Sequence, residues 1–296
     1  GSGPQNRDEE LLGHKPFLIL SDFLTRNGIA VLRYDDRGTA LSKGDFKTAT
    51  SADFATDVES AIAYLKTRKE INTKNIGLIG HSEGGLIAPM VASKSKDVAF
   101  IVLLAGTGIQ GERLLLLQQK LIGKASGISE DDLQKSELTN RQVFDIVNKS
   151  SNLEKLNLDL TNYIKQTLKD NPNAGKPAGM SDDEFVNLRV KQIANPWMQY
   201  FIKYNPAPTL EKVKCPVLAI NGEKDLQVPP KENLEAIKSA LSKGGNKKVT
   251  TKVLPNLNHL FQECKTGSPD EYATIEQTFS PTALSEILKW LQMQTK

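Results

Sequence analysis

The sequence predicts an α/β protein with a doubly wound, mostly parallel β-sheet. Two observations support this fold class. Short apolar runs alternate with amphipathic helical patterns, and one long helical segment interrupts the alternation. Residues 76–88 carry an apolar run, a Gly-x-Ser-x-Gly turn and a helical pattern in succession. Apolar runs that alternate with helices are typical of parallel strands covered by helices on both faces.

The composition is that of an ordinary globular protein, with 39% hydrophobic and 25% charged residues among 296. This length suits one large domain with an insertion, or two smaller domains. The formal net charge of +3 is small, and no basic tract is interleaved with aromatic residues, so we expect no nucleic-acid partner. No apolar run approaches the roughly 20 residues that cross a bilayer, so we expect no membrane span.

The two cysteines, Cys215 and Cys264, lie far apart in the sequence and have no metal-ligand spacing. Two cysteines do not make a disulfide framework, and we therefore expect two unpaired thiols.

The first part of the chain alternates regularly between the two element types. Helices are predicted at 17–27, 51–69 and 84–93, and strands at 29–34, 75–80 and 98–104. Ser51 is the expected N-cap of the second helix. The apolar run 29–34 predicts a strand that is buried on both faces. Asp35, Asp36 and Arg37 follow it, where ligand crevices form in open sheets, although a hydrogen-bonded turn is the commoner role for such residues.

Residues 109–204 contain helical patterns only, and we expect them to form a cap over the site. The predicted helices are 114–122, 131–147, 153–168 and 182–193, with a loop at 171–177. The alternation then returns with strands at 216–222 and 248–254 and helices at 231–241 and 281–294. We therefore predict a core made of residues 1–108 and 205–296, with residues 109–204 as a helical cap.

Ser82 is the central residue of the Gly-x-Ser-x-Gly turn. A sharp strand-to-helix turn of this kind holds its serine in a strained conformation and lifts the hydroxyl above the sheet edge. Gly80 and Gly84 are small because the strand and the helix pass close to each other there. The sequence thus predicts a nucleophilic serine at the carboxyl edge of the sheet.

A serine nucleophile needs a base, and the base needs an acid that fixes its tautomer. The chain has three histidines. His81 adjoins Ser82, and neighbouring side chains on such a turn point in different directions. His14 precedes the first predicted helix. This leaves His259, in the loop after the last strand, as the expected base. Asp225 and Glu223 both follow an earlier strand and are candidates for the acid. We favour Asp225 because it lies farther past the end of that strand than Glu223 does. The order serine, aspartate, histidine is the order used on sheets of this kind.

These residues give the chain a resemblance to the α/β-hydrolase superfamily. Residues 80–84, 222–225 and 258–259 match that superfamily in kind, order and placement. More narrowly, residues 1–9, 34–38, 259–262 and 271–272 are similar to a bacterial carboxylesterase-like branch with a helical cap. The resemblance implies an oxyanion hole made by the N–H of Glu83 and an N–H of the Gly1–Gly3 loop. Because Pro4 has no N–H, Ser2 or Gly3 must donate from that loop.

The resemblance also implies a strand just before Gly1, between the strands at 29–34 and 75–80. We therefore expect the chain to be the carboxyl-terminal part of a longer protein with amino-terminal strands upstream. This expectation leaves the location open between the cytoplasm and the periplasm or exterior.

The function expected from the sequence is hydrolysis of a small carboxylic ester through an acyl-enzyme, with neither a metal nor a cofactor. A serine peptidase or aminopeptidase, an acyltransferase and a thioesterase could use the same triad. A non-catalytic binding module is disfavoured by the intact triad. A dehalogenase is excluded, because that chemistry needs an aspartate where Ser82 stands.

Overall fold

The computed structural model describes residues 1–171 and 175–295. Its sheet has four parallel strands in the order β1-β2-β3-β4. The strands are β1 (Gly77–His81), β2 (Phe100–Leu104), β3 (Val217–Gly222) and β4 (Val249–Leu254). Each pairs in parallel register with the next along the chain. The prediction of a parallel α/β sheet is confirmed, and these four strands match four of the five predicted ones.

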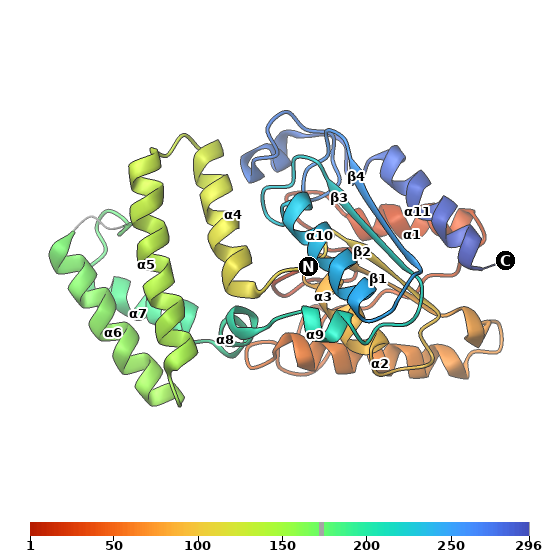
Figure 1. Cartoon of the computed structure of the whole chain (residues 1–296), viewed down its shortest axis with the longest axis horizontal. Helices are drawn as coiled ribbons and strands as arrows, with labels where there is room; N and C mark the ends of the chain where they lie inside the picture. Colours follow the sequence, from red (N-terminus) through yellow and green to blue (C-terminus); the bar gives the residue numbers. More distant parts are fainter. Residues whose placement is uncertain (172–174, 296) are drawn as a thin grey trace.

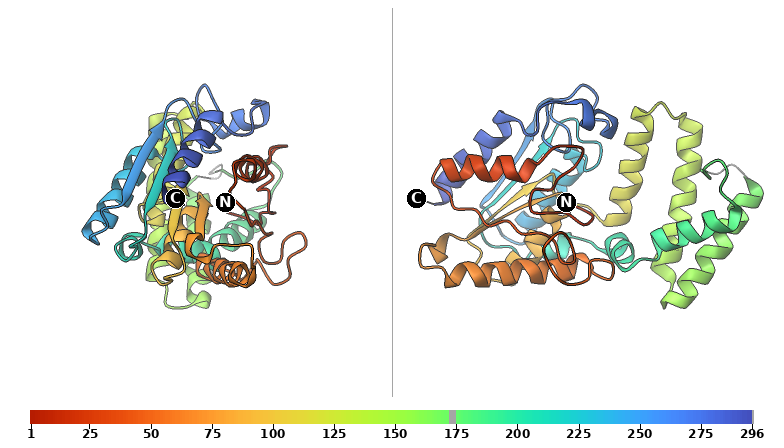
Figure 2. Two further views of the ribbon diagram at one scale, coloured as in Figure 1. Left: turned by 90° about the vertical axis from the view of Figure 1, so that its right-hand side faces the viewer. Right: turned by 180° about the vertical axis from the view of Figure 1, so that it is seen from behind.

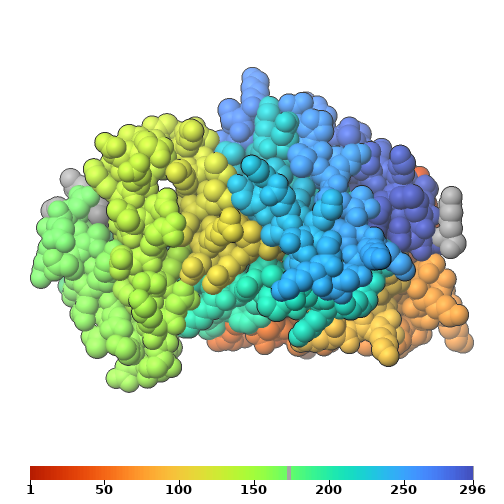
Figure 3. Space-filling model, viewed as in Figure 1, coloured from red at the N-terminus to blue at the C-terminus, as the bar shows by residue number. Residues whose placement is uncertain are grey.

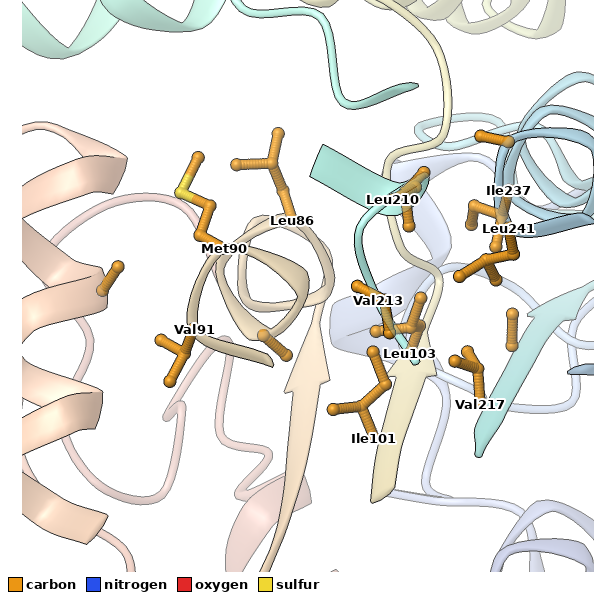
Figure 4. Packing of buried hydrophobic residues seen from close by; sticks show 14 of the residues in the cluster. Leu86, Met90, Val91, Ile101, Leu103, Leu210, Val213, Val217, Ile237 and Leu241 are labelled. Carbon is orange, nitrogen blue, oxygen red and sulfur yellow. The ribbon is translucent and has the colours of Figure 1, made fainter. Parts of the chain in front are cut away.

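Helices cover both faces of this sheet (Figures 1 and 2). The helices α1 (Pro16–Arg26) and α11 (Pro281–Gln294) pack on one face, and α2 (Ser51–Thr67), α3 (Gly84–Ala92) and α10 (Pro230–Lys243) pack on the other. Strand β2 divides its side chains between the two cores, as a pleated strand must. Ile101 and Leu103 face α3 and α10 (Figure 4), whereas Val102 faces α1 and α11.

The predicted strand at 29–34 is wrong. This segment forms no ladder, and its Val31, Leu32 and Tyr34 are 39, 39 and 38% exposed. Strand β1 is the outermost strand of the sheet order, and a cavity of about 830 Å³ separates it from the segment 29–34. An apolar run becomes a strand only when a neighbour satisfies its backbone, and no described strand lies beside this one. The explanation that the sequence analysis gives for the missing neighbour between segment 29–34 and β1 stays a prediction.

The described residues between 109 and 204 fold into a helical group with its own apolar core, which we call the helical insert (Figures 1 and 3). Its helices are α4 (Gly111–Ala125), α5 (Glu130–Lys149), α6 (Leu153–Asp170), α7 (Asp182–Ile193) and α8 (Pro196–Lys203). The first four were predicted, with shorter bounds for three of them. The predicted loop 171–177 falls partly on 172–174, which lie outside the described residues. The role of the insert as a cap is a proposal.

Helix α8 escaped the sequence analysis because its start looks like a turn. Asn195 caps the helix by accepting from the N–H of Met198, and Pro196 occupies the first helical position. Eight residues are too few for a clear helical period. The shorter elements α9 (Ala207–Leu210), η1 (Thr73–Asn75) and η2 (Pro269–Thr274) complete the described chain. Within it, no helix is both long and apolar enough to cross a membrane.

Replacing Gly80 with alanine should destabilise the protein by about 3 kcal/mol. A Cβ at Gly80 would lie 2.0 Å from the carbonyl oxygen of Gly84, so the strand and the helix would have to separate. Gly84→Ala is the matched control. Contrary to the expectation that both glycines must be small, a Cβ at Gly84 meets nothing within 4 Å. We expect that variant to stay within about 1 kcal/mol of the wild type. Urea unfolding measures both, and equal midpoints for the two variants would contradict the close-approach argument.

Candidate active site

Ser82 sits on a strained turn between β1 and α3. Its φ is +52°, a left-handed conformation that a serine keeps only when its surroundings hold it there. One restraint is the bond from the Ser82 N–H to the carbonyl oxygen of Leu104, at 2.8 Å, which ties the turn to the end of β2. The side chain is half-buried. The structure thus shows the strand, sharp turn and helix that the sequence motif predicts.

Asp225 and His259 follow β3 and β4, and the two side chains meet. His259 Nδ1 lies 2.8 Å from Asp225 Oδ2, and both residues are buried. The other carboxylate oxygen of Asp225 accepts from the N–H groups of Gln227 and Val228, at 2.9 and 2.8 Å. These bonds fix the plane of the carboxylate. Glu223, the other acid considered, is exposed and accepts from the N–H of Asn256 instead.

His259 lies beside the serine turn. The ring of His81, the residue before Ser82, has its centroid 4.7 Å from the ring centroid of His259. His81 Nε2 also lies 2.9 Å from the carbonyl oxygen of His259. No bond between Ser82 and His259 is among those of the described residues, so a working triad stays a proposal. His14 is engaged elsewhere, with Thr278 and the carbonyl oxygen of Tyr272.

The amino-terminal loop is bound to the loop after residues 29–34. Arg7 forms a bidentate pair with Asp35, at 3.0 and 2.7 Å, and the N–H of Gln5 donates to Asp36 at 3.0 Å. Asp35 and Asp36 therefore hold two loops together. This is the structural role of a hydrogen-bonded turn, and not the role of residues that line a ligand crevice. Gly1 lines the cavity beside β1.

The candidate oxyanion residues of this loop are not joined to the serine. Ser2 is exposed, and the described residues include no hydrogen bond from Ser2 or Gly3 to Ser82. Glu83, the third candidate, is the N-cap of α3. The first N–H groups of a helix have no partner within it, which leaves the Glu83 N–H able to donate.

The Glu83 side chain has a role that the sequence analysis missed. Its Oε1 accepts from Ser51 Oγ at 2.6 Å and from Trp197 Nε1 at 2.7 Å. The carboxyl group therefore joins the serine turn to α2 and to α8 of the helical insert. Burial raises the pKa of Glu83, and the two hydrogen bonds only partly oppose that shift. Ser51 is the first residue of α2, and Thr50 caps the helix in its place.

Glu83→Gln should be more stable than the wild type near neutral pH. A raised folded-state pKa means that the wild type loses stability as the pH rises above the ordinary glutamic acid value of 4.5. Glutamine keeps the Oε1 acceptor and carries no charge, so its advantage should grow with pH and vanish below that value. Urea unfolding across a pH series measures the difference. An advantage that is the same at low and neutral pH would contradict a buried charge as its cause.

The described residues were also searched for metal-ligating clusters and for cysteine pairs. Over residues 1–171 and 175–295, no three His, Cys, Asp or Glu side chains are grouped to bind a metal ion. Cys215 and Cys264 are both free, as predicted. Burial raises the pKa of the Cys215 thiol to about 11, so it stays protonated near neutral pH.

Comparison with known proteins gives related sequences and folds. Esterase EstD of Thermotoga maritima is 27% identical over 98% of this chain, which spans 60% of the length of EstD. The Pyrococcus furiosus esterase Pf2001 superposes with a TM-score of 0.52 and 15% identity, covering 95% of this chain and 76% of that one. The α/β hydrolase GrgF of Penicillium sp. sh18 superposes with a TM-score of 0.56 and 15% identity, covering 94% and 84%.

The resemblance to α/β-hydrolases is confirmed at the level of the fold by these structures. A family model described as X-Pro dipeptidyl-peptidase (S15 family) matches residues 4–259, which include the serine turn and both loops of the Asp225–His259 pair. With most of its length matched and the corresponding fold in place, the chain belongs to the X-Pro dipeptidyl-peptidase (S15) family.

Proposed function

We propose that this protein is a serine hydrolase that cleaves carboxylic esters through an acyl-enzyme. The observation that carries the proposal is the placement of Ser82. It has a left-handed backbone at a strand-to-helix turn, beside the loop that bears a buried His259–Asp225 pair. A serine, an imidazole and a carboxylate in this order are the parts that acyl transfer needs.

In the proposed reaction, Ser82 Oγ attacks the ester carbonyl carbon while His259 Nε2 takes its proton. Asp225 accepts from Nδ1–H, which leaves Nε2 free to act as the base and stabilises the imidazolium that forms. The N–H of Glu83 and one N–H of the loop at Ser2 and Gly3 stabilise the oxyanion. His259 then protonates the leaving alkoxide. Water next gives a proton to His259 and attacks the acyl carbon, and collapse of that intermediate returns the proton to Ser82 Oγ and releases the acid.

The choice of an ester substrate is supported by the relatives. EstD and Pf2001 are both described as esterases. A dipeptidyl-peptidase activity is the competing proposal, since the matched family model is named for it. The same serine, histidine and aspartate would serve a peptide bond, so the difference must lie in how the leaving group and the acyl side are bound.

Two substrate classes separate these proposals. p-Nitrophenyl esters of graded acyl length should be hydrolysed with kcat/KM at least about tenfold above that of Xaa-Pro p-nitroanilides. The opposite ranking would replace the esterase proposal with the peptidase. A fluorophosphonate probe should label Ser82. Failure to label it would favour a binding module without catalysis. Transfer of the acyl group to an added alcohol or thiol in preference to water would favour an acyltransferase.

A further inference from the structure

His259 lies on a tight loop, residues 257–263, which we call the histidine loop. An antiparallel bridge between its first and last residues closes the loop at its base, and all of its residues except the last are buried. A buried loop cannot leave its backbone N–H groups to water, so they need partners inside the protein. The side chain of Asn258 supplies the partner for two of them.

The amide of Asn258 makes three hydrogen bonds inside the histidine loop. Its Oδ1 accepts from the N–H of Leu260 at 3.0 Å and from the N–H of Gln262 at 2.9 Å. Its Nδ2 donates to Gln262 Oε1 at 2.9 Å. Among the described residues this is the single hydrogen bond of the Gln262 side chain, since Gln262 Nε2 has no partner there. The Gln262 side chain therefore fixes the orientation of the Asn258 amide, with its oxygen toward the two N–H groups.

The main chain of Asn258 also touches the segment that leads to the acid. A Cβ on Gly222, the last residue of β3, would lie 2.6 Å from the carbonyl oxygen of Asn258. Asp225 follows Gly222 after a short turn, and His259 directly follows Asn258. Because the two main chains are in contact here, a shift of the histidine loop would change the distance between Asp225 Oδ2 and His259 Nδ1, which is 2.8 Å.

We propose that Asn258 is a positioning residue for His259, which acts through the shape of the histidine loop. Asp225 restrains the imidazole ring, but a bond at Nδ1 leaves the main chain of His259 unrestrained. Asn258 restrains that main chain by binding two N–H groups that follow His259 in the loop. The direction of Nε2, the atom that takes the serine proton in the proposed reaction, depends on both restraints. The effect on catalysis rests on the proposed function, whereas the restraint of the loop does not.

Asn246 provides a matched control at the opposite end of the sheet. It is also buried, and its amide also makes three hydrogen bonds. Nδ2 donates to the carbonyl oxygens of Val213 and Cys215 at 3.1 and 2.8 Å, and Oδ1 accepts from the N–H of Lys248 at 2.9 Å. Asn246 precedes β4 and Asn258 follows it. Replacing Asn246 therefore removes a similar set of buried bonds without changing the histidine loop.

The restraint of the loop is tested by amide hydrogen exchange on the full chain. In the wild type the N–H groups of Leu260 and Gln262 should exchange slowly, because both are buried and bonded. Asn246→Ala measures how much faster they exchange when stability alone is lost. In Asn258→Ala both should accelerate by at least about tenfold more than in that control. Equal acceleration in the two variants would overturn the restraint.

The positioning role is tested by kinetics on p-nitrophenyl esters, under conditions in which each variant is folded. In Asn258→Ala we expect kcat to fall about 10- to 100-fold, with KM changed less than about threefold. Asn258→Ser should recover part of that loss, because a serine hydroxyl can accept from the N–H two residues further on, which is that of Leu260. Asn246→Ala should unfold at lower urea concentration than the wild type but keep its kcat.

The outcomes separate this proposal from the proposed function. An unchanged kcat in folded Asn258→Ala would overturn the positioning role, and so would an equal loss of kcat in Asn246→Ala. If Asn258→Ala does not fold, the kcat of Asn258→Ser relative to Asn246→Ser decides the matter, and equal values would overturn the role. If the wild type shows no ester hydrolysis, the proposed function fails, while the exchange rates still decide whether Asn258 restrains the histidine loop.

Discussion

Replacing Ser82 with alanine is expected to reduce kcat for p-nitrophenyl esters by about 10⁶-fold, which is the scale of losing a serine nucleophile. Without Oγ no acyl-enzyme forms, and only the oxyanion donors and substrate binding remain to assist attack by water. Initial rates, together with the burst of the first turnover, measure the loss. Labelling by a fluorophosphonate probe should disappear as well.

Ser93→Ala is the control for this variant. Ser93 is the C-cap of α3, the helix that begins just after Ser82, and its hydroxyl donates to the carbonyl oxygen of Met90. Ester hydrolysis and labelling should both be retained in it. If Ser82→Ala still reacted with the probe, the nucleophile would be another residue and the proposed mechanism would be lost.

Asp225→Asn is expected to lower kcat by about 10⁴-fold while the fold is kept. The amide oxygen can still accept from the N–H groups of Gln227 and Val228, and the bond lost from the buried turn is the longer one, from Asn221 Nδ2 to Oδ2 at 3.2 Å. Its NH₂ group then faces His259 Nδ1 and forces the ring proton to Nε2, where it blocks proton transfer from Ser82. Near-ultraviolet circular dichroism checks the fold, and ester hydrolysis across pH measures the activity.

Glu223→Gln provides the comparison. Glu223 follows the same strand but is exposed, and among the described residues its side chain accepts a hydrogen bond from the Asn256 N–H alone. Its activity should match the wild type to within about a factor of three. A large loss in Glu223→Gln with little change in Asp225→Asn would reverse the assignment of the acid.

The sequence was sufficient for the features that depend on local pattern. Strands β1 to β4 are apolar runs with polar turns at their ends, and the order of Ser82, Asp225 and His259 matches the order in which those strands end. His259 was reached by elimination among three histidines, and the structure places it beside the serine turn. For these features, the sequence of a residue and its immediate neighbours contains the information that predicts its place in the fold.

The features that were missed depend on contacts between distant segments. The run 29–34 has the composition of a buried strand, but a strand also needs a partner, and its composition says nothing about that. Trp197 lies 114 positions from Glu83, and Glu9 lies 72 positions from His81. Each of these pairs forms because tertiary packing brings together polar groups that are buried or, for Trp197, partly buried, and no spacing rule connects them.

The bond between Trp197 and Glu83 gives the protein an optical reporter of the candidate active site. The chain has two tryptophans, and the other, Trp290, is buried against Phe100 in the core between the sheet and α11. Indole emission responds to the polarity and hydrogen bonding of its surroundings, and only Trp197 touches the serine turn. A change in intrinsic fluorescence when an inhibitor enters would therefore come from the boundary between the helical insert and the serine turn, with no dye attached.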